Sequence, residues 1–288
     1  MLKKNIYLDN HASTKIDPRV YKGMLSIYSE HFGNPHSASH QHGWLAESFI
    51  NKSRLKISNA IGSKKDEIFF TSGATESNNL VIKGIALSQN KKKHIITCVT
   101  EHKCILESCK FLETLGFKIS YLKVNKYGHI NLKEFKKTIK PDTFLVSIMA
   151  VNNEIGTIHP LNKIGKICKA KKILFHTDAS QALGKINFNV KDLNIDLASF
   201  SSHKIYGPKG IGAIYLKKEL DLRIVPLLSG GGQENGLRSG TLPTALCAAF
   251  GHAIELVVKE KNKNVKKIKQ LKKTFLHTLK KTKVNYFL

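Results

Sequence analysis

The amino-acid sequence predicts an α/β fold: a mainly parallel sheet of seven strands with helices on both of its faces. Seven short apolar runs recur along the chain, and several are separated by segments in which apolar residues repeat every three or four positions. Strands that are apolar at successive positions are buried on both faces, and their alternation with helices is typical of parallel sheets. Ligands bind beyond the carboxyl ends of such strands, which indicates where the chemistry should lie.

The strands are predicted from runs rich in β-branched and aromatic residues. We expect them at residues 67–71, 94–99, 118–122, 144–149, 173–177, 197–200 and 212–216. Helical spacing of apolar residues follows the first strand at 80–87 and the second at 105–115, and it precedes the fifth at 164–168. These segments are the expected helices of the outer layers.

Beyond Pro243 the character of the sequence changes. Residues 245–258 are apolar with helical spacing, and residues 259–283 are rich in lysine, with apolar residues such as Leu271 and Phe275 spaced three or four apart. This pattern predicts one long amphipathic helix or a pair. A nucleic-acid-binding arm is one interpretation, but we expect the helix to pack its apolar stripe on the protein. The last five residues, VNYFL, resemble the start of a strand without a partner, so we expect an incomplete carboxyl-terminal domain.

The charge and the cysteines exclude several classes of protein. The 47 lysines and arginines outnumber 21 acidic residues, a formal net charge of +26, which would suit a polyanionic partner. Only four of the 47 are arginine, the side chain that best recognises phosphates and bases, so we expect solvated lysine faces and no specific nucleic-acid ligand.

Five scattered cysteines without a CxxC pair argue against a metal site and suit a reducing compartment. No apolar run suits a membrane span or a secretory signal, so we expect a cytoplasmic protein without membrane contact.

Polar residues follow three of the predicted strands. Residues 71–79, TSGATESNN, lead from the first strand into a helix whose N–H groups could bind an anion. Asp178 follows the fifth strand in DASQ, and Lys204 follows the sixth in SSHKIYGPKG. Taken singly, the small polar residues and Asp178 could be helix caps, and Lys204 a surface lysine. Together, an anion cradle, an acid and an amine on one rim meet the needs of pyridoxal phosphate for its phosphate, ring nitrogen and aldehyde.

Six segments resemble the cysteine desulfurases of the NifS/IscS group, which are fold-type I pyridoxal-phosphate enzymes. They are TSGATESNN (71–79), TEHK (100–103), VNNEIG (151–156), DASQ (178–181), SSHKIYGPKG (201–210) and RSGT (238–241). The resemblance is collinear from residue 6 to the end, and it is closer to the iron–sulfur-assembly branch than to the SufS branch. It departs at Ser202, where the family usually has glycine, and at residues 233–235, QEN, where it often has His-Glu-Arg.

Carried over position by position, the resemblance implies the site residues. Lys204 binds the cofactor as a Schiff base and moves the substrate's α-proton, and Asp178 pairs with the ring nitrogen. His102 stacks on the ring and serves in acid–base steps. Gln181 bonds the ring hydroxyl, and Asn153 lies beside that hydroxyl and the substrate carboxylate. The other residues bind the cofactor, chiefly its phosphate, the last of them from the neighbouring subunit of a homodimer: Ala74, Thr75, Ser201, Ser202, His203 and Thr241.

Some of these residues also have a purely structural interpretation. The resemblance, in addition, implies a division of the chain into domains. His102 could be a packed core histidine, Asn153 a turn former and Thr241 a helix cap. Residues 1–15 would form the N-terminal segment of a small domain, residues 16–255 the large cofactor-binding domain, and residues 256–288 the long helix and the start of a truncated small domain.

The implied reaction converts L-cysteine to L-alanine. Its sulfur passes to a mobile, accessible cysteine thiolate and then to an iron–sulfur scaffold, another acceptor protein or tRNA thiolation. In the family this cysteine lies on a loop that would fall past Leu288, and none of the five cysteines aligns with it. We therefore expect a chain that binds pyridoxal phosphate and transfers little sulfur to itself. Two alternatives are another pyridoxal-phosphate lyase or aminotransferase with the same site, and an inactive lysine-rich remnant that binds polyanions.

Overall fold

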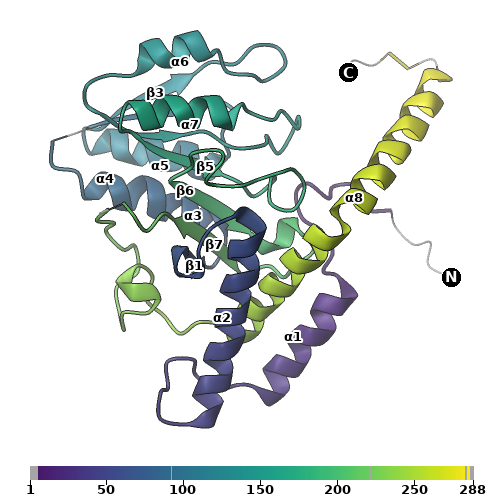
Figure 1. The fold of residues 1–288 in the computed structure, drawn as a ribbon. Coiled ribbons are helices and arrows are strands. Elements are labelled where there is room, and N and C mark those ends of the chain that lie inside the picture. Colours follow the sequence, from purple (N-terminus) through teal and green to yellow (C-terminus); the bar gives the residue numbers. More distant parts are fainter. Residues whose placement is uncertain (1–5, 92, 221, 283, 286–288) are drawn as a thin grey trace.

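A seven-stranded sheet in the order β1-β7-β6-β5-β4-β2-β3 forms the centre of the computed structural model, which describes residues 6–91, 93–220, 222–282 and 284–285 (Figure 1). The strands are β1 (Ile68–Thr71), β2 (His94–Cys98), β3 (Lys118–Leu122), β4 (Thr143–Ser147), β5 (Leu174–Asp178), β6 (Leu197–Ser201) and β7 (Gly212–Leu216). Strand β7 pairs antiparallel with β1 and β6, and the remaining neighbours pair in parallel. The predicted mainly parallel sheet is confirmed, and each strand begins and ends within two residues of its predicted range.

Helices cover both faces of the sheet. On one face lie α3 (Ala74–Asn79), the π-helical turn η2 (Leu80–Gly84), α4 (Ile85–Leu87) and α5 (Lys103–Thr114). On the other lie α2 (Gln41–Ile61), α6 (Leu132–Thr138), α7 (Leu161–Ala170) and the first part of α8 (Thr244–Lys280), with α1 (Pro18–Glu30) packed against α8. The 3₁₀ turns are η1 (Lys65–Glu67), η3 (Ser202–Lys204) and η4 (Glu234–Gly236).

Successive residues of a strand enter two separate apolar cores. On β4, Val146 belongs to the core beneath α2, α7 and α8, and Leu145 belongs to the core beneath α4 and α5. On β6, Ala198 and Leu197 divide in the same way. Because both faces are covered, each position of these strands must be apolar or internally hydrogen-bonded, which explains the continuous apolar runs.

Helix α8 is one continuous helix of 37 residues, which resolves the choice between one helix and a pair. Its first half buries Phe250 and Ile254 against the core, whereas Leu271 and Phe275 in its second half are largely exposed. Figure 1 shows this half projecting away from the sheet. The expectation that the whole apolar stripe packs on the protein is therefore wrong for the described residues, because no described element lies over the second half.

The predicted domain boundary at residues 255–256 lies inside α8, and the three-part division stays a prediction. Of the strand expected at 284–288, residues 284 and 285 lie in no strand and the others lie outside the described residues. No helix among the described residues is both long enough and apolar enough to cross a lipid bilayer.

Phe250 and Phe275 offer a matched test of where α8 is anchored. Phe250 is fully buried, so Phe250→Ala should lower the free energy of unfolding by about 3–5 kcal/mol. Phe275 is 65% exposed in the same helix, and Phe275→Ala should change this free energy by less than about 0.5 kcal/mol. Urea denaturation followed by circular dichroism measures both. A loss in Phe275→Ala as large as that in Phe250→Ala would show that the second half of α8 is packed in solution.

Candidate active site

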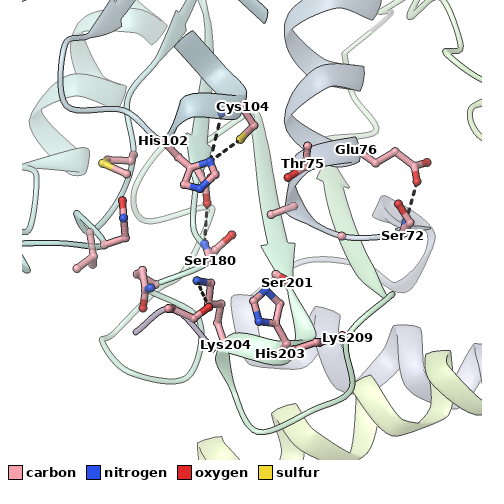
Figure 2. Close-up of a pocket in the computed structure, with 18 of the residues that line it drawn as sticks. Ser72, Thr75, Glu76, His102, Cys104, Ser180, Ser201, His203, Lys204 and Lys209 are labelled. Carbon is pink, nitrogen blue, oxygen red and sulfur yellow. Dashed lines mark hydrogen bonds between the residues drawn. The ribbon is translucent and has the colours of Figure 1, made fainter. Parts of the chain in front are cut away.

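The polar segments that follow the strands meet at one cavity of about 470 Å³ at the carboxyl edge of the sheet (Figure 2). Its volume is in the range of sites for small ligands and cofactors. Every predicted site residue except Ser202 and Thr241 lines it, namely Ala74, Thr75, His102, Asn153, Asp178, Gln181, Ser201, His203 and Lys204. Asp178 and Lys204, the acid and the amine, therefore line the same cavity.

Asp178 is the last residue of β5, and its carboxylate is held on both oxygens. The side-chain amide of Asn78 donates to Oδ2 at 2.7 Å, and the backbone N–H of Ser180 donates to Oδ1 at 2.9 Å. Asp178 is only 7% exposed, so these donors replace the water that a buried carboxylate would otherwise lose. The carboxylate is thus fixed in orientation at the wall of the cavity.

Lys204 lies on the η3 turn directly after β6 and is half-buried. Its Nζ donates to the backbone carbonyls of His11 and Ala12, each at 2.8 Å. Burial lowers the pKa of Lys204, and the negative charges of nearby carboxylates, Asp178 foremost, oppose part of this effect. A lysine with a lowered pKa is more often present as the free amine, which is the form that attacks an aldehyde.

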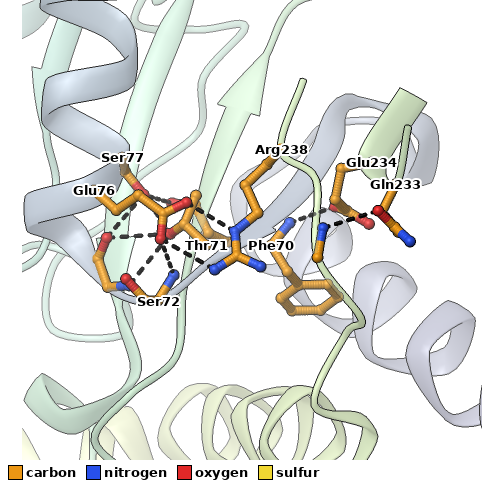
Figure 3. Close-up of polar contacts among 11 residues, drawn as sticks. Phe70, Thr71, Ser72, Glu76, Ser77, Gln233, Glu234 and Arg238 are labelled. Atoms are coloured by element: carbon orange, nitrogen blue, oxygen red, sulfur yellow. Dashed lines mark hydrogen bonds and ion pairs between the residues drawn. The ribbon is translucent and has the colours of Figure 1, made fainter. Parts of the chain in front are cut away.

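The turn between β1 and α3, predicted as an anion cradle, lies at the cavity. Glu76 in the first turn of α3 accepts a hydrogen bond from the backbone N–H of Ser72 at 2.8 Å. Its other oxygen accepts from Arg238 Nε at 2.9 Å, and both side chains are largely buried (Figure 3). Burial raises the pKa of Glu76, but the bonds from Arg238 and Ser72 outweigh it and leave the pKa below its usual value. The RSGT segment is therefore tied to the cradle by an ion pair.

A second set of contacts ties the loop before RSGT to β1 (Figure 3). The buried carboxylate of Glu234 accepts the backbone N–H of Phe70 at 2.6 Å and pairs with the guanidinium of Arg54. Gln233 Oε1 accepts the backbone N–H of Gly240 at 2.8 Å. Thr241 follows this tied segment, but it is exposed and lies outside the cavity that the described residues form.

The two predicted histidines have different surroundings. His102 is the N-cap of α5, where its Nδ1 accepts the backbone N–H of Cys104 at 3.2 Å. His203 Nδ1 lies 3.2 Å from Ser13 Oγ. Burial lowers the pKa of His203 to about 4, with a smaller contribution from neighbouring lysines, so its imidazole is neutral at neutral pH. His102 is thus a capping residue that faces the cavity and not the packed core histidine of the structural interpretation.

Gln181 and Asn153 form hydrogen bonds with other residues of the chain. Gln181 donates to the His11 carbonyl at 2.7 Å and accepts from Lys185 Nζ at 2.6 Å. Burial and the charge of Lys204 lower the pKa of Lys185 to about 8. Asn153 donates to Glu154 at 2.7 Å at the cavity rim, whereas Ser202 is fully buried behind the cavity wall.

Sequence reasoning missed three buried residues around the site. Asn78 contacts Asp178 across 100 positions of sequence, and no local pattern indicates such a contact. Glu101 is buried beside the cavity, where Oε1 accepts the Met149 backbone N–H at 2.7 Å and burial raises its pKa well above the usual value. Ser180 lines the cavity next to Asp178, and its sequence position beside that residue was an available signal.

The groups around the cavity fit pyridoxal phosphate. A fixed carboxylate, a lysine with a lowered pKa and the β1–α3 turn at the start of a helix match its ring nitrogen, aldehyde and phosphate. Ser180 Oγ is buried at the cavity and has no hydrogen-bond partner among the described residues, so a donor remains for a bound molecule.

Residues 6–287 match the family model for aminotransferase class-V. The chain is 54% identical over 275 residues, 95% of its length, to cysteine desulfurase IscS of Rickettsia typhi, and 52% identical over 270 residues, 93% of its length, to a probable mitochondrial cysteine desulfurase of Dictyostelium discoideum. It spans 67% and 60% of those two proteins. A solved NifS-like protein superimposes with a TM-score of 0.92 at 43% identity, over 95% of this chain and 75% of that one. The chain belongs to the class-V aminotransferase family and, within it, to the cysteine desulfurases of the NifS/IscS group.

Proposed function

We propose that this chain acts in a pyridoxal-phosphate-dependent cysteine desulfurase that converts L-cysteine to L-alanine and delivers the sulfur for iron–sulfur cluster assembly or tRNA thiolation. The observation that carries the proposal is that Asp178 and Lys204 face one cavity beside the β1–α3 turn. A lyase or aminotransferase could use the same three groups. The identity of 52–54% to proteins named cysteine desulfurase favours desulfuration.

The proposal assigns each group a task. Pyridoxal phosphate, when bound, supplies an electron sink that weakens bonds to the carbon next to the substrate amine. The amine of Lys204 would hold the cofactor at its aldehyde carbon and move a proton at the substrate α-carbon, and the Asp178 carboxylate would keep the ring nitrogen protonated. His102, which lines the cavity, would stack on the ring and exchange a proton with the reacting atoms. Gln181 and Asn153 orient the ring hydroxyl.

The phosphate would be held from two sides of the cavity. The residues proposed to do so share short side chains or ring N–H groups at the ends of β1 and β6; they are Ala74, Thr75, Ser201, Ser202 and His203. Ser202 is buried behind the cavity wall, so its proposed contribution is the least direct. Thr241, exposed after the segment that Arg238 ties to Glu76, would reach the phosphate of a neighbouring subunit.

A homodimer is therefore part of the proposal. It is supported by a set of exposed apolar and aromatic side chains on α1, on α2 and between them: Tyr21, Leu25, Tyr28, Phe32, Trp44 and Leu45. Exposed apolar side chains gathered in one region mark protein interfaces. An iron–sulfur scaffold or another sulfur acceptor is the proposed further partner. Five free cysteines, none of them in a disulfide, suit the proposed cytoplasmic location.

The sulfur-accepting thiolate is not expected among the five cysteines of this chain. All five lie in described parts of the structure, and four are buried while Cys104 is half-buried. Burial raises the pKa of every one of them, to about 11 for Cys104 and about 12 for Cys109 and Cys168. An acceptor must be an accessible thiolate. The sulfur must then pass to a thiol other than these five.

Borohydride reduction tests the cofactor site. Pyridoxal phosphate added to the protein should give an absorbance band that reduction fixes, and peptide mass spectrometry should find the reduced adduct on Lys204. Lys204→Ala should abolish the adduct, and Lys56→Ala, on the surface of α2, should retain it. A wild-type protein that gains no band with excess cofactor would contradict the assignment of the whole site.

The pH dependence of cofactor uptake tests the lowered pKa of Lys204. Because burial lowers this pKa from 10.5, the free amine forms at lower pH than in an exposed lysine. The rate of uptake of pyridoxal phosphate should rise with pH and level off below pH 10.5. In Asp178→Asn the midpoint should move to still lower pH, since the charge of Asp178 raises the pKa of Lys204. A stopped-flow midpoint at or above that of N-acetyl-lysine amide would contradict the burial argument.

The products separate desulfuration from the alternatives. With L-cysteine and dithiothreitol as the external thiol, the loaded protein should release alanine and sulfide, whereas a lyase or an aminotransferase should release a keto acid. Without an external thiol, mass spectrometry should find little or no persulfide on the five cysteines. Persulfide formation equal to that of the Rickettsia typhi protein, measured in parallel, would refute the argument from the buried thiols.

A further inference from the structure

A continuous chain of polar contacts connects Asp178 with His102, the residues assigned to the ring nitrogen and to the ring face. Asn78 on α3 contacts Asp178 Oδ2 at 2.7 Å and Cys104 Sγ at 3.1 Å, in both cases through its Nδ2. Cys104 Sγ in turn lies 3.1 Å from His102 Nδ1 (Figure 2). Asn78 is fully buried, so water does not compete for these contacts.

The donor and the acceptor of each contact follow from the chemistry of the groups. A carboxylate oxygen only accepts, so the atom of Asn78 that faces Asp178 must be the amide nitrogen. The second hydrogen of that nitrogen points to Cys104 Sγ, which accepts it. The backbone N–H of Cys104 also donates to His102 Nδ1, at 3.2 Å. A backbone N–H cannot accept, so this contact favours an unprotonated Nδ1, but at 3.2 Å it is a long hydrogen bond that does not fix the tautomer by itself.

The thiol of Cys104 completes the chain as a second donor to His102. Burial, with the charge of Asp178, raises the pKa of Cys104 to about 11, so the sulfur keeps its hydrogen at neutral pH. With Asn78 donating to the sulfur, that hydrogen is free to point at Nδ1. With these two donors sharing the one lone pair of Nδ1, the ring proton of His102 lies on Nε2.

We propose that Cys104 and Asn78 are positioning residues that hold His102 as the Nε2–H tautomer and fix its ring relative to Asp178. The inference rests on the proposed role of His102 at the cofactor. A hydroxyl in place of the thiol would do the same work, whereas a methyl group would leave Nδ1 with one donor. Asn78 contributes indirectly, since its amide nitrogen holds the Cys104 sulfur and the Asp178 carboxylate at the same time.

The tautomer of His102 can be measured without cofactor, by ¹⁵N NMR of histidine-labelled apoprotein with the His102 signals assigned through His102→Gln. Wild type and Cys104→Ser should show the Nε2–H form. Cys104→Ala and Asn78→Ala should shift the population toward Nδ1–H. Cys109→Ala is the matched control, because it removes a buried thiol from an apolar position of the same helix, and it should leave the spectrum unchanged.

Kinetics of the loaded enzyme give the second readout. Cys104→Ala should lower kcat for alanine formation without a matching change in cofactor affinity, and Cys104→Ser should restore it. An unchanged tautomer in Cys104→Ala or in Asn78→Ala would overturn the proposal, as would an equal shift in Cys109→Ala. Persulfide on Cys104 after exposure to L-cysteine would also overturn it, because the sulfur would then be an acceptor. Failure of the proposed function is seen separately, as a wild-type protein that binds no cofactor.

Discussion

The parallel pairing of β5 with β6 is the constraint on which the site depends. With Asp178 opposite Ser199 in this register, the acid at the end of one strand lies next to the turn that carries Lys204 at the end of the other. The pairing is available only because both faces of the two strands are covered by helices. A carboxylate buried at such a strand end needs donors, and Asn78 and Ser180 supply them from two different segments. The layers of the fold thus dictate the orientation of these two side chains.

Further order comes from side chains that touch no ligand. Two largely buried ion pairs tie a loop late in the sequence to other segments: Arg238 pairs with Glu76 at the start of α3, and Glu234 pairs with Arg54 on α2. Breaking either pair would leave a buried charge without a partner, which is far more costly than losing an exposed pair. These contacts give the RSGT segment a fixed place although it forms no regular helix or strand. Buried ion pairs thus fix this irregular segment, whereas apolar packing fixes the helices and strands.

The strands, the β1–α3 turn, Asp178 and Lys204 could be predicted from local sequence patterns, whereas the other cavity residues, such as His102, Asn153 and Gln181, were predicted only through the resemblance to a family. An apolar run indicates a buried strand, and polar residues at its end lie on the ligand edge, which located Asp178 and Lys204. Contacts between distant segments have no such signature. Arg54 and Glu234 are 180 positions apart, and no pattern in either segment indicates that the two side chains pair. Helical periodicity shows which face of α8 is apolar, but it cannot show which element covers that face. Periodicity therefore could not show that Leu271 and Phe275 are exposed.

The two carbonyls that hold Lys204 belong to His11 and Ala12, in the segment that leads into α1. A lysine nitrogen joined to an aldehyde carbon has exchanged two of its hydrogens for that bond, so it cannot keep serving both carbonyls as a charged amine does. Loading the site as proposed would therefore compete with the chain's own backbone for one nitrogen atom. The anchorage of the segment around His11 would then report occupancy, because hydrogen exchange in this segment would differ between the empty and the loaded protein.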